Sequence, residues 1–282
     1  MTAKDWFAKA RKEQFALGAF NVGNLETLEA IVAAAKEKKA PLLIESSSGE
    51  TKFMGAHNLA ALVHEYRERE GLPIFLNLDH SPSLEEARVG IEAGFDLIHF
   101  DGSKLPYEEN LQLMKTIVHG AHAKNLMTEG ELENIVGSSE VHKGEMPEPI
   151  YSDPEKDSRF ASETGIDTFA VSIGNLHGLY EKPKKLNFDL LEQLSKKLGC
   201  FMSLHGSSGI SDDQIHKAIS LGVVKININT EMRKAYRETL ESVLKEHKGE
   251  YAMYKIMPPV IEAVQSVVEK KLDLFGSSGK AL

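Results

Sequence analysis

The chain has 282 residues, of which 41% are hydrophobic and 27% charged, and this is enough for one large domain spanning residues 1–282. The formal net charge of −9 comes without a long basic run, which argues against nucleic-acid binding, and we interpret the cluster of Lys182, Lys184 and Lys185 as a solvated loop. A single cysteine, no apolar signal sequence and no apolar run long enough to span a membrane together predict a cytoplasmic protein without a membrane partner.

Short apolar runs rich in Val, Ile, Leu and Phe alternate along the chain with longer segments of helical periodicity. The predicted strands are Leu17–Val22, Pro41–Glu45, Pro73–Asp79, Leu97–Asp101, Leu126–Glu131, Thr168–Ile173, Phe201–His205 and Val223–Ile228. The predicted helices include Leu25–Lys38, Leu84–Ala93, Glu108–Lys124, Phe188–Lys197, Asp212–Leu221, Thr230–Lys248 and Pro258–Leu274. Eight strand–helix units favour an α/β fold, a closed (β/α)8 TIM barrel with extra C-terminal helices packed outside it. An open, doubly wound sheet is the alternative, because periodicity does not prove closure.

One segment departs from this alternation. Residues Glu133–Asp157 contain several Gly, Ser and Pro residues and are too long for an ordinary connection between a strand and a helix. We expect a mobile loop over the functional site, and an inert surface insertion is the alternative.

The third predicted strand ends in Asp79 and His80, the position at which α/β proteins place reactive groups. Neighbours on an extended backbone point to opposite faces, so we expect the two residues to have separate tasks at a shared site, one holding a metal and the other moving a proton.

Two more histidines, His177 and His205, lie at comparable strand ends. Three neutral imidazoles with one open coordination position are typical of a catalytic zinc site, although they could also be structural histidines of the barrel rim. After the seventh and eighth strands, Gly206–Gly209 and Lys225–Thr230 offer backbone amides and hydroxyls where barrels often bind phosphate.

Seven motifs, taken in their order along the chain, resemble those of the class II, zinc-dependent ketose-bisphosphate aldolases of the fructose- and tagatose-bisphosphate type. The motifs are Ala19–Val22, Leu78–His80, Phe100–Ser103, Ile173–Gly178, Leu204–Gly209, Lys225–Thr230 and Leu274–Ala281. The resemblance spans Phe20 to Lys280. It implies a carbon–carbon lyase that reversibly cleaves a ketose 1-phosphate or 1,6-bisphosphate to dihydroxyacetone phosphate and an aldehyde. It also implies Zn²⁺ or another divalent transition metal, a monovalent cation (Na⁺ or K⁺), and a homodimer or homotetramer.

The resemblance also assigns roles to residues. It implies that His80, His177 and His205 bind the catalytic metal and that Asp79 exchanges a proton with the C4 hydroxyl. Asp101 and Glu131 match carboxylates that can hold the metal in an alternative, buried position. Residues that match the substrate and phosphate site are Ser47, Gly178, Gly206, Ser208, Asn227, Asn229 and Thr230.

Three departures from the family pattern bear on the substrate. The usual Tyr-Lys pair is replaced by Tyr180-Glu181-Lys182, so Lys182 is the candidate phosphate contact. An arginine that reaches the distal phosphate of a neighbouring subunit is replaced by Ile261, which cannot bind phosphate. The glycine-rich start of the mobile loop is altered, and Glu140 is the nearest candidate for its catalytic acid. These changes raise the alternative of a ketose 1-phosphate whose distal end is not a phosphate.

Three other functions fit parts of the pattern. A class I aldolase would use a Schiff-base lysine, for which Lys225 is best placed. A metal-dependent hydrolase would leave the phosphate-binding rim without a purpose. A sugar-phosphate sensor would keep the fold and the metal without turnover, and the presence of Asp79 with all three histidines argues against it.

Overall fold

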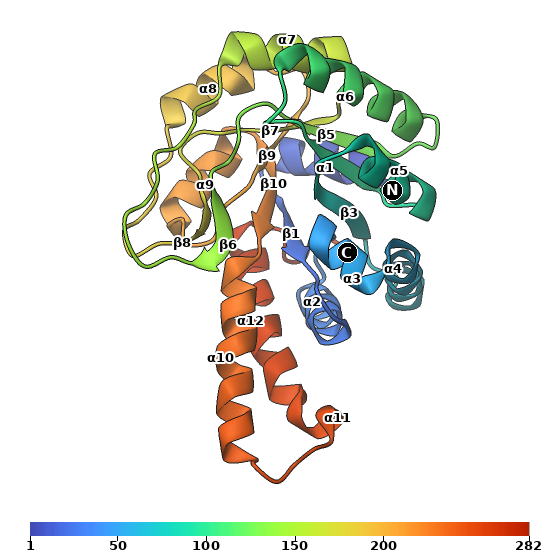
Figure 1. Ribbon diagram of the computed structural model, residues 1–282, viewed down its shortest axis with the longest axis vertical. Helices are drawn as coiled ribbons and strands as arrows, with labels where there is room; N and C mark the ends of the chain where they lie inside the picture. The colour runs from blue at the N-terminus through green and yellow to red at the C-terminus, as the bar shows by residue number, and fades with distance from the viewer. Residues whose placement is uncertain (282) are drawn as a thin grey trace.

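The protein is described by a computed structural model, which covers residues 1–281 and contains a closed barrel of eight parallel strands (Figure 1). In order around the barrel the strands are β1 (Leu17–Asn21), β10 (Val223–Ile228), β9 (Phe201–Leu204), β7 (Thr168–Ala170), β5 (Met127–Glu131), β4 (Leu97–Asp101), β3 (Ile74–Ser81) and β2 (Leu42–Ser47). The pairing of β1 with both β2 and β10 closes the sheet. The predicted TIM barrel is confirmed, and the open sheet is excluded.

Helices pack around this barrel, most of them on its outer face (Figure 1). They are α1 (Ala3–Glu13), α2 (Leu25–Lys38), α3 (Ser48–Met54), α4 (Ala56–Glu70), α5 (Leu84–Ala93), α6 (Tyr107–His122), α7 (Pro154–Thr164), α8 (Phe188–Lys197), α9 (Asp212–Ser220), α10 (Thr230–Glu246), α11 (Met253–Ile256) and α12 (Pro258–Leu274). Their ends carry local signals. In α2, for example, the side chain of Asn24 accepts the N–H of Thr27 at the start, and Lys39 ends the helix in the left-handed conformation.

Alternate residues of the strands point into the barrel, so its interior is layered by the two-residue period of the strands. The layer nearest the N-terminal strand ends is apolar and includes Leu43, Phe75 and Leu97, which cluster with Trp6 and Phe7 of α1. Helix α1 therefore closes that end of the barrel. The same strands place polar side chains two and four residues further on, toward the opposite end.

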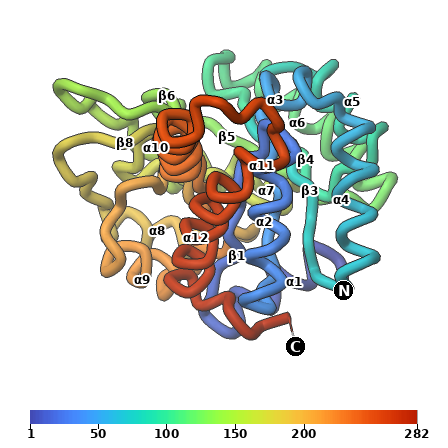
Figure 2. Tube along the Cα trace, turned by 90° about the horizontal axis from the view of Figure 1, so that it is seen from below, coloured from blue at the N-terminus to red at the C-terminus, as the bar shows by residue number. Residues whose placement is uncertain are grey.

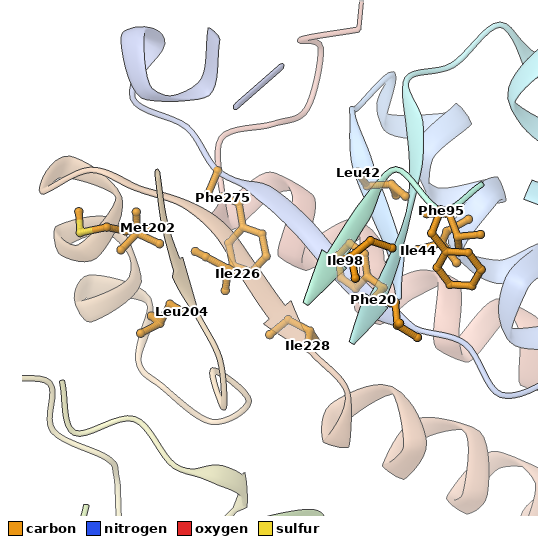
Figure 3. Close-up of a cluster of buried hydrophobic side chains, with 14 of the residues drawn as sticks. Phe20, Leu42, Ile44, Phe95, Ile98, Met202, Leu204, Ile226, Ile228 and Phe275 are labelled. Carbon is orange, nitrogen blue, oxygen red and sulfur yellow. The ribbon is translucent and has the colours of Figure 1, made fainter. Parts of the chain in front are cut away.

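The outward-facing strand residues form the main hydrophobic core with the surrounding helices. Figure 3 shows part of this core, where Phe20, Ile44, Ile98, Ile226 and Phe275 are buried together. Each fully buried side chain of this size contributes about 2 kcal/mol of hydrophobic free energy. This packing fixes the strands, and with them the side chains at their carboxyl ends.

Two C-terminal helices form an arm. Helices α10 and α12 run side by side away from the barrel, with α11 at the tip (Figure 1), and α12 also packs against α2 (Figure 2). A small cluster of Val243, Ile256, Met257 and Val260 joins the helices of the arm. Ile261 packs against this cluster, half-buried.

The predicted loop Glu133–Asp157 is wrong in two places. It contains a short strand, β6 (Gly137–Val141), and its last residues belong to α7. β6 pairs in parallel with β8 (His177–Leu179), a second strand that the sequence did not predict, and the two form a small sheet outside the barrel. Among the residues that the structure describes, no helix is both long and apolar enough to cross a membrane.

Candidate active site

A cavity of about 300 Å³ opens at the carboxyl ends of the barrel strands. Eleven of the predicted site residues line it, in agreement with the rule that active sites of barrels lie at this end. They are Ser47, Asp79, His80, His177, Gly178, His205, Gly206, Ser208, Asn227, Asn229 and Thr230. The structure therefore brings together residues of β2, β3, β8 and β10, of the segments that follow β9 and β10, and of the start of α10.

His80 and Asp79 share one side of the strand despite being neighbours, so the expected opposite orientation is wrong. The pairing of β3 with β4 is irregular between Leu78 and Ser81, and His80 has a φ of 49°. This left-handed conformation is uncommon for a residue with a side chain, and such conformations are often found at functional sites. It brings His80 Nε2 to 3.9 Å from Asp79 Oδ1.

Each of the three predicted metal-binding histidines has one ring nitrogen engaged by the protein. His80 Nδ1 lies 3.2 Å from Asp101 Oδ2. His177 Nδ1 donates to the carbonyl oxygen of Ile135 at 2.8 Å, and His205 Nε2 lies 2.7 Å from Glu129 Oε1. Metal-binding histidines commonly donate their second N–H to a carboxylate or carbonyl in this way. The nitrogens left to bind a metal are Nε2 of His80 and Nε2 of His177. His205 Nδ1 also faces the cavity, but it accepts the side-chain amide of Asn227 at 3.1 Å, a hydrogen bond that a metal would have to replace.

The protonation states of these rings suit a metal. Burial lowers the pKa of His177 to about 4 and that of His205 to about 3, so both rings are neutral near pH 7 and offer a lone pair. Burial alone would also lower the pKa of His80, but the carboxylates of Asp79 and Glu131 raise it well above its usual value. The same negative charge favours a divalent cation, and the buried Nε2 of His80 has no hydrogen-bond partner in the structure. The residues therefore fit a divalent metal.

Asp79 lies where it can act beside that metal. Its Oδ1 is 3.9 Å from both His80 Nε2 and His205 Nδ1, and its Oδ2 accepts the side-chain amide of Asn21 at 3.2 Å. Burial alone would raise the pKa of Asp79, but the neighbouring imidazoles, His80 foremost, hold it well below its usual value. The side chain is thus an ionised carboxylate at the floor of the cavity.

A second group of ligands lies behind His80. Oxygens of Asp101 and Glu131 lie 3.2 Å and 3.4 Å from His80 Nδ1, and the Oε2 atom of Glu131 is buried without a hydrogen-bond partner. His80, Asp101 and Glu131 together offer three ligand atoms that lie close to one another. This arrangement can hold a metal in a buried position apart from the cavity.

His99 was not among the predicted site residues. It is fully buried, it accepts the backbone N–H of His80 at its Nδ1 (3.1 Å), and its Nε2 lies 3.3 Å from Glu131 Oε2. The ring centroid of His99 is 4.5 Å from that of His80 and 4.8 Å from that of His205. The alternation of β4 could have revealed it, because His99 precedes Asp101 by two residues and so faces the interior.

Lys225 is buried in an ion pair below the cavity. Its Nζ lies 2.8 Å from Glu129 Oε2 and 3.7 Å from Glu45 Oε2. Burial alone would lower the pKa of Lys225, but these carboxylates raise it above the usual value. An amine held in its protonated form by two carboxylates is a poor nucleophile, so the Schiff-base alternative loses its candidate lysine.

One side of the cavity carries groups that can bind an anion. Asn229 and Thr230 stand at the N-terminus of the 17-residue helix α10, where backbone N–H groups and the helix dipole favour a phosphate. Opposite them the chain turns at Gly206, whose φ is 61° and at which an added Cβ would lie 2.4 Å from the carbonyl oxygen of Leu176. Only glycine fits this close approach.

Two predicted site residues lie away from the cavity. Lys182 is exposed and lines a separate groove with Met146 and Pro183. Glu140 is exposed on β6, and its carboxylate accepts the hydroxyl of Ser138 at 3.4 Å. The positions of these side chains give no support to a role in phosphate binding for Lys182 or in catalysis for Glu140.

Two basic residues gain importance from the structure. Arg233, in the first turn of α10, is the one Lys or Arg among the described residues that line the cavity, and its Nη2 donates to Glu50 Oε1 at 2.7 Å. Glu50 Oε2 in turn accepts the hydroxyl of Ser47 at 2.8 Å. Lys184, which we interpreted as part of a solvated loop, is only 1% exposed. That interpretation is wrong for Lys184.

Comparisons with known proteins identify the family of the chain. The family described as fructose-bisphosphate aldolase class-II matches residues 1–280. The chain is 39% identical to a fructose-bisphosphate aldolase of Streptococcus pneumoniae, over 100% of this chain and 99% of that protein, and 36% identical to one of Geobacillus stearothermophilus, over 100% and 98%. The crystal structure of the YdjI aldolase from Escherichia coli K12 has a TM-score of 0.84 to this structure at 29% identity, covering 100% of this chain and 99% of that one.

Proposed function

This chain belongs to the class II fructose-bisphosphate aldolase family, the aldehyde-lyases that cleave ketose bisphosphates with a divalent metal, and we propose which of its residues perform that reaction. Zinc is held by His80, His177 and His205, and Asp79 is the acid/base. The observation that carries this proposal is that ring nitrogens of His80 and His205 each lie 3.9 Å from the Asp79 carboxylate, while His177 lines the same cavity with its ring centroid 5.1 Å from that of His80. Release of dihydroxyacetone phosphate from fructose and tagatose 1,6-bisphosphate tests the substrate and shows which configuration at C4 is accepted.

The residues of the chain account for the retro-aldol step. When bound, the metal supplies a Lewis acid that polarises the ketone and stabilises developing negative charge. Asp79 takes the proton of the C4 hydroxyl, and the electron pair of the C3–C4 bond moves to C3 as the aldehyde forms at C4. After the aldehyde leaves, a proton that comes ultimately from solvent is added to C3 to give dihydroxyacetone phosphate, and Asp79 releases its proton to solvent. The side-chain amide of Asn227, which lies 3.1 Å from His205 Nδ1 in the cavity, is a hydrogen-bond donor for the charge that develops on the three-carbon product.

Water must be kept from that product, because it would protonate the carbanion before condensation can occur in the reverse direction. Gly137, Ser138 and Ser139 of β6 line the cavity opening. Pairing of β6 with β8 holds this cover beside His177, whose backbone N–H donates to Val136. We therefore infer that β6 covers the cavity and keeps water from the carbanion.

The phosphate on C1 is assigned to the anion-binding side of the cavity, with Gly178, Gly206, Ser208, Asn229 and Thr230 as its contacts. The identity of the metal as zinc rests on the donor set, since neutral imidazoles suit zinc, although cobalt and iron bind such sites too. The carboxylates Asp101 and Glu131 are assigned to an alternative position of the same ion.

The distal phosphate of a bisphosphate is assigned to Arg233. The arginine expected on the C-terminal helix is replaced by Ile261, which packs inside the arm. Arg233 brings a guanidinium to the side of the cavity that holds Ser47 and Asn21, and a guanidinium can bind phosphate through two parallel hydrogen bonds. This favours a bisphosphate over a ketose 1-phosphate with an uncharged distal end.

Replacing Arg233 should therefore discriminate between substrates. We expect Arg233→Ala to raise KM for the preferred ketose 1,6-bisphosphate by about tenfold to a hundredfold, the usual value of a charged hydrogen-bonded contact. The effect on a ketose 1-phosphate should be less than about threefold, since this substrate lacks the distal phosphate. Steady-state cleavage of both substrates measures the difference.

Arg237→Ala is the matched control, because Arg237 lies one turn further along α10, is exposed, and pairs with Glu241. It should leave both substrates unaffected. An equal loss on both substrates in Arg233→Ala would instead place Arg233 at the C1 phosphate, and no loss would remove it from substrate binding.

We also propose that residues 1–282 act as one barrel domain in the reducing cytoplasm and assemble as a homodimer or homotetramer. Support for assembly comes from the tip of the arm, where Tyr251 and Tyr254 are 87% and 77% exposed beside the half-exposed Met253. Such an apolar patch is typical of a protein–protein interface. Sedimentation velocity should give a mass of two or four chains, and Tyr251→Ser/Tyr254→Ser should lower it, whereas a monomeric wild-type protein would contradict the assembly.

A further inference from the structure

Lys184 lies in an unusual environment for a lysine. Its side chain is buried, and its Nζ donates to three main-chain carbonyl oxygens, those of Gly178 (2.7 Å), Gly206 (2.7 Å) and Ser208 (2.6 Å). No carboxylate of the described residues lies within salt-bridge distance of it. A neutral amine has only two N–H donors, so three acceptors at these distances require the ammonium form.

The charge is buried at a cost that the site must compensate. Burial lowers the pKa of Lys184 to about 7, and the more distant Glu231 opposes this shift. Three carbonyl dipoles directed at one point are an arrangement in which proteins replace the hydration shell of a monovalent cation. The backbone of this segment is also fixed, because the side chain of Gln214 on α9 bonds to the carbonyl of Lys184 and to the N–H of Leu186.

The three carbonyls belong to the anion-binding side of the cavity, since Gly178, Gly206 and Ser208 all line it. In a trans peptide the carbonyl and the following N–H point in opposite directions. Turning the carbonyl of Gly206 toward Lys184 therefore turns the N–H of Ser207, another cavity residue, away from it. The ammonium thus fixes the orientation of the peptides from which the anion site is built.

The geometry points to Lys184 as a built-in monovalent cation that orients the phosphate-binding loops, so that this protein needs no free Na⁺ or K⁺. Lys184 is a positioning residue, because its ammonium contacts main-chain carbonyls and not the reacting atoms. The inference rests on the proposed function for the identity of the anion as the C1 phosphate. The three-carbonyl cage itself does not depend on that assignment.

Two substitutions separate the charge of Lys184 from the space that it fills. Lys184→Ala removes the charge and leaves room for a cation and its water, whereas Lys184→Met removes the charge and keeps the space filled. Both should raise KM for the ketose bisphosphate about tenfold or more in choline chloride while kcat changes less than about threefold, because only phosphate binding is affected. KCl or NH4Cl at the same ionic strength should rescue Lys184→Ala and not Lys184→Met.

Thermal unfolding gives a readout that is independent of activity. In KCl, compared with choline chloride, we expect the melting temperature of Lys184→Ala to rise by about 3 °C or more, since a bound ion stabilises the folded state. Wild-type protein and Lys184→Met should show no such rise. Lys185→Ala is the control, because Lys185 is the next residue and is exposed.

The wild-type protein also decides the question by itself, should Lys184→Ala fail to fold. Equal activity in choline, sodium and potassium salts supports a built-in cation. A loss of more than about fivefold in choline that K⁺ restores would overturn it, as would wild-type KM and melting behaviour in Lys184→Ala. If no ketose bisphosphate is cleaved under any condition, the proposed function fails, and the thermal-shift comparison still tests Lys184.

Discussion

Removing the metal is expected to abolish aldol cleavage, and returning zinc is expected to restore it. A Lewis acid stabilises the charge of the transition state by several kcal/mol, so the loss should be about a thousandfold or more. Cleavage of the preferred ketose bisphosphate, followed as dihydroxyacetone phosphate, is measured before chelation, after it and after dialysis against zinc.

Substitution of one ligand should have the same effect as chelation. His205→Ala removes a neutral, fully buried ring nitrogen, and it should lower both the zinc content and the activity. His216→Ala is the control, since His216 is exposed on α9. Activity that survives both chelation and His205→Ala would show that the metal is dispensable and would reopen the Schiff-base mechanism, which borohydride trapping detects.

Replacing Asp79 should separate catalysis from metal binding. Asp79 Oδ1 lies 3.9 Å from His80 Nε2 and from His205 Nδ1, the nitrogens proposed to bind the metal, but Asp79 is not one of the proposed ligands. We expect Asp79→Ala to keep its zinc and to lose cleavage by about a hundredfold to ten-thousandfold, the range for a lost general base. Metal analysis and kcat on the same preparation test both parts.

Asp79→Asn refines this test. An asparagine keeps the shape of the side chain and can still accept the amide of Asn21, but it cannot take a proton. It should be as inactive as Asp79→Ala, while Asp213→Ala, at an exposed position on α9, should behave as wild type. Near-normal cleavage by Asp79→Asn would assign the proton transfer to another group.

The barrel was predictable because its signals are local and repeated. Leu97–Asp101 and Val223–Ile228 are strands with the predicted bounds, and four predicted helices, including Leu25–Lys38, also match in full. Thr168–Ile173 was predicted too long, since β7 ends at Ala170. Ser172 instead bonds to Ser152 of the preceding segment, a contact between distant residues that periodicity does not report.

The candidate site was predictable wherever a side chain lies at the carboxyl end of a regular strand, as for His205 and Asn227. It was not predictable where backbone geometry or burial decides. The left-handed turn at His80 depends on a local shift in strand pairing, and the hydrophilic character of Lys184 gave no sign of its burial. Glu140 and Lys182 were predicted because they lie close in sequence to family motifs that are altered here. Closeness in sequence does not determine where an irregular segment places its side chains.

The position of the metal tests the account most directly, because four neighbouring histidines, His80, His99, His177 and His205, lie close enough to compete for it. Anomalous diffraction at the zinc edge from crystals with bound dihydroxyacetone phosphate would locate the ion. We expect a single peak about 2.1 Å from His80 Nε2, His177 Nε2 and His205 Nδ1, beside the Asp79 carboxylate. A zinc ion bound by His99 in place of His177, or no zinc in an active crystal, would contradict the proposed site.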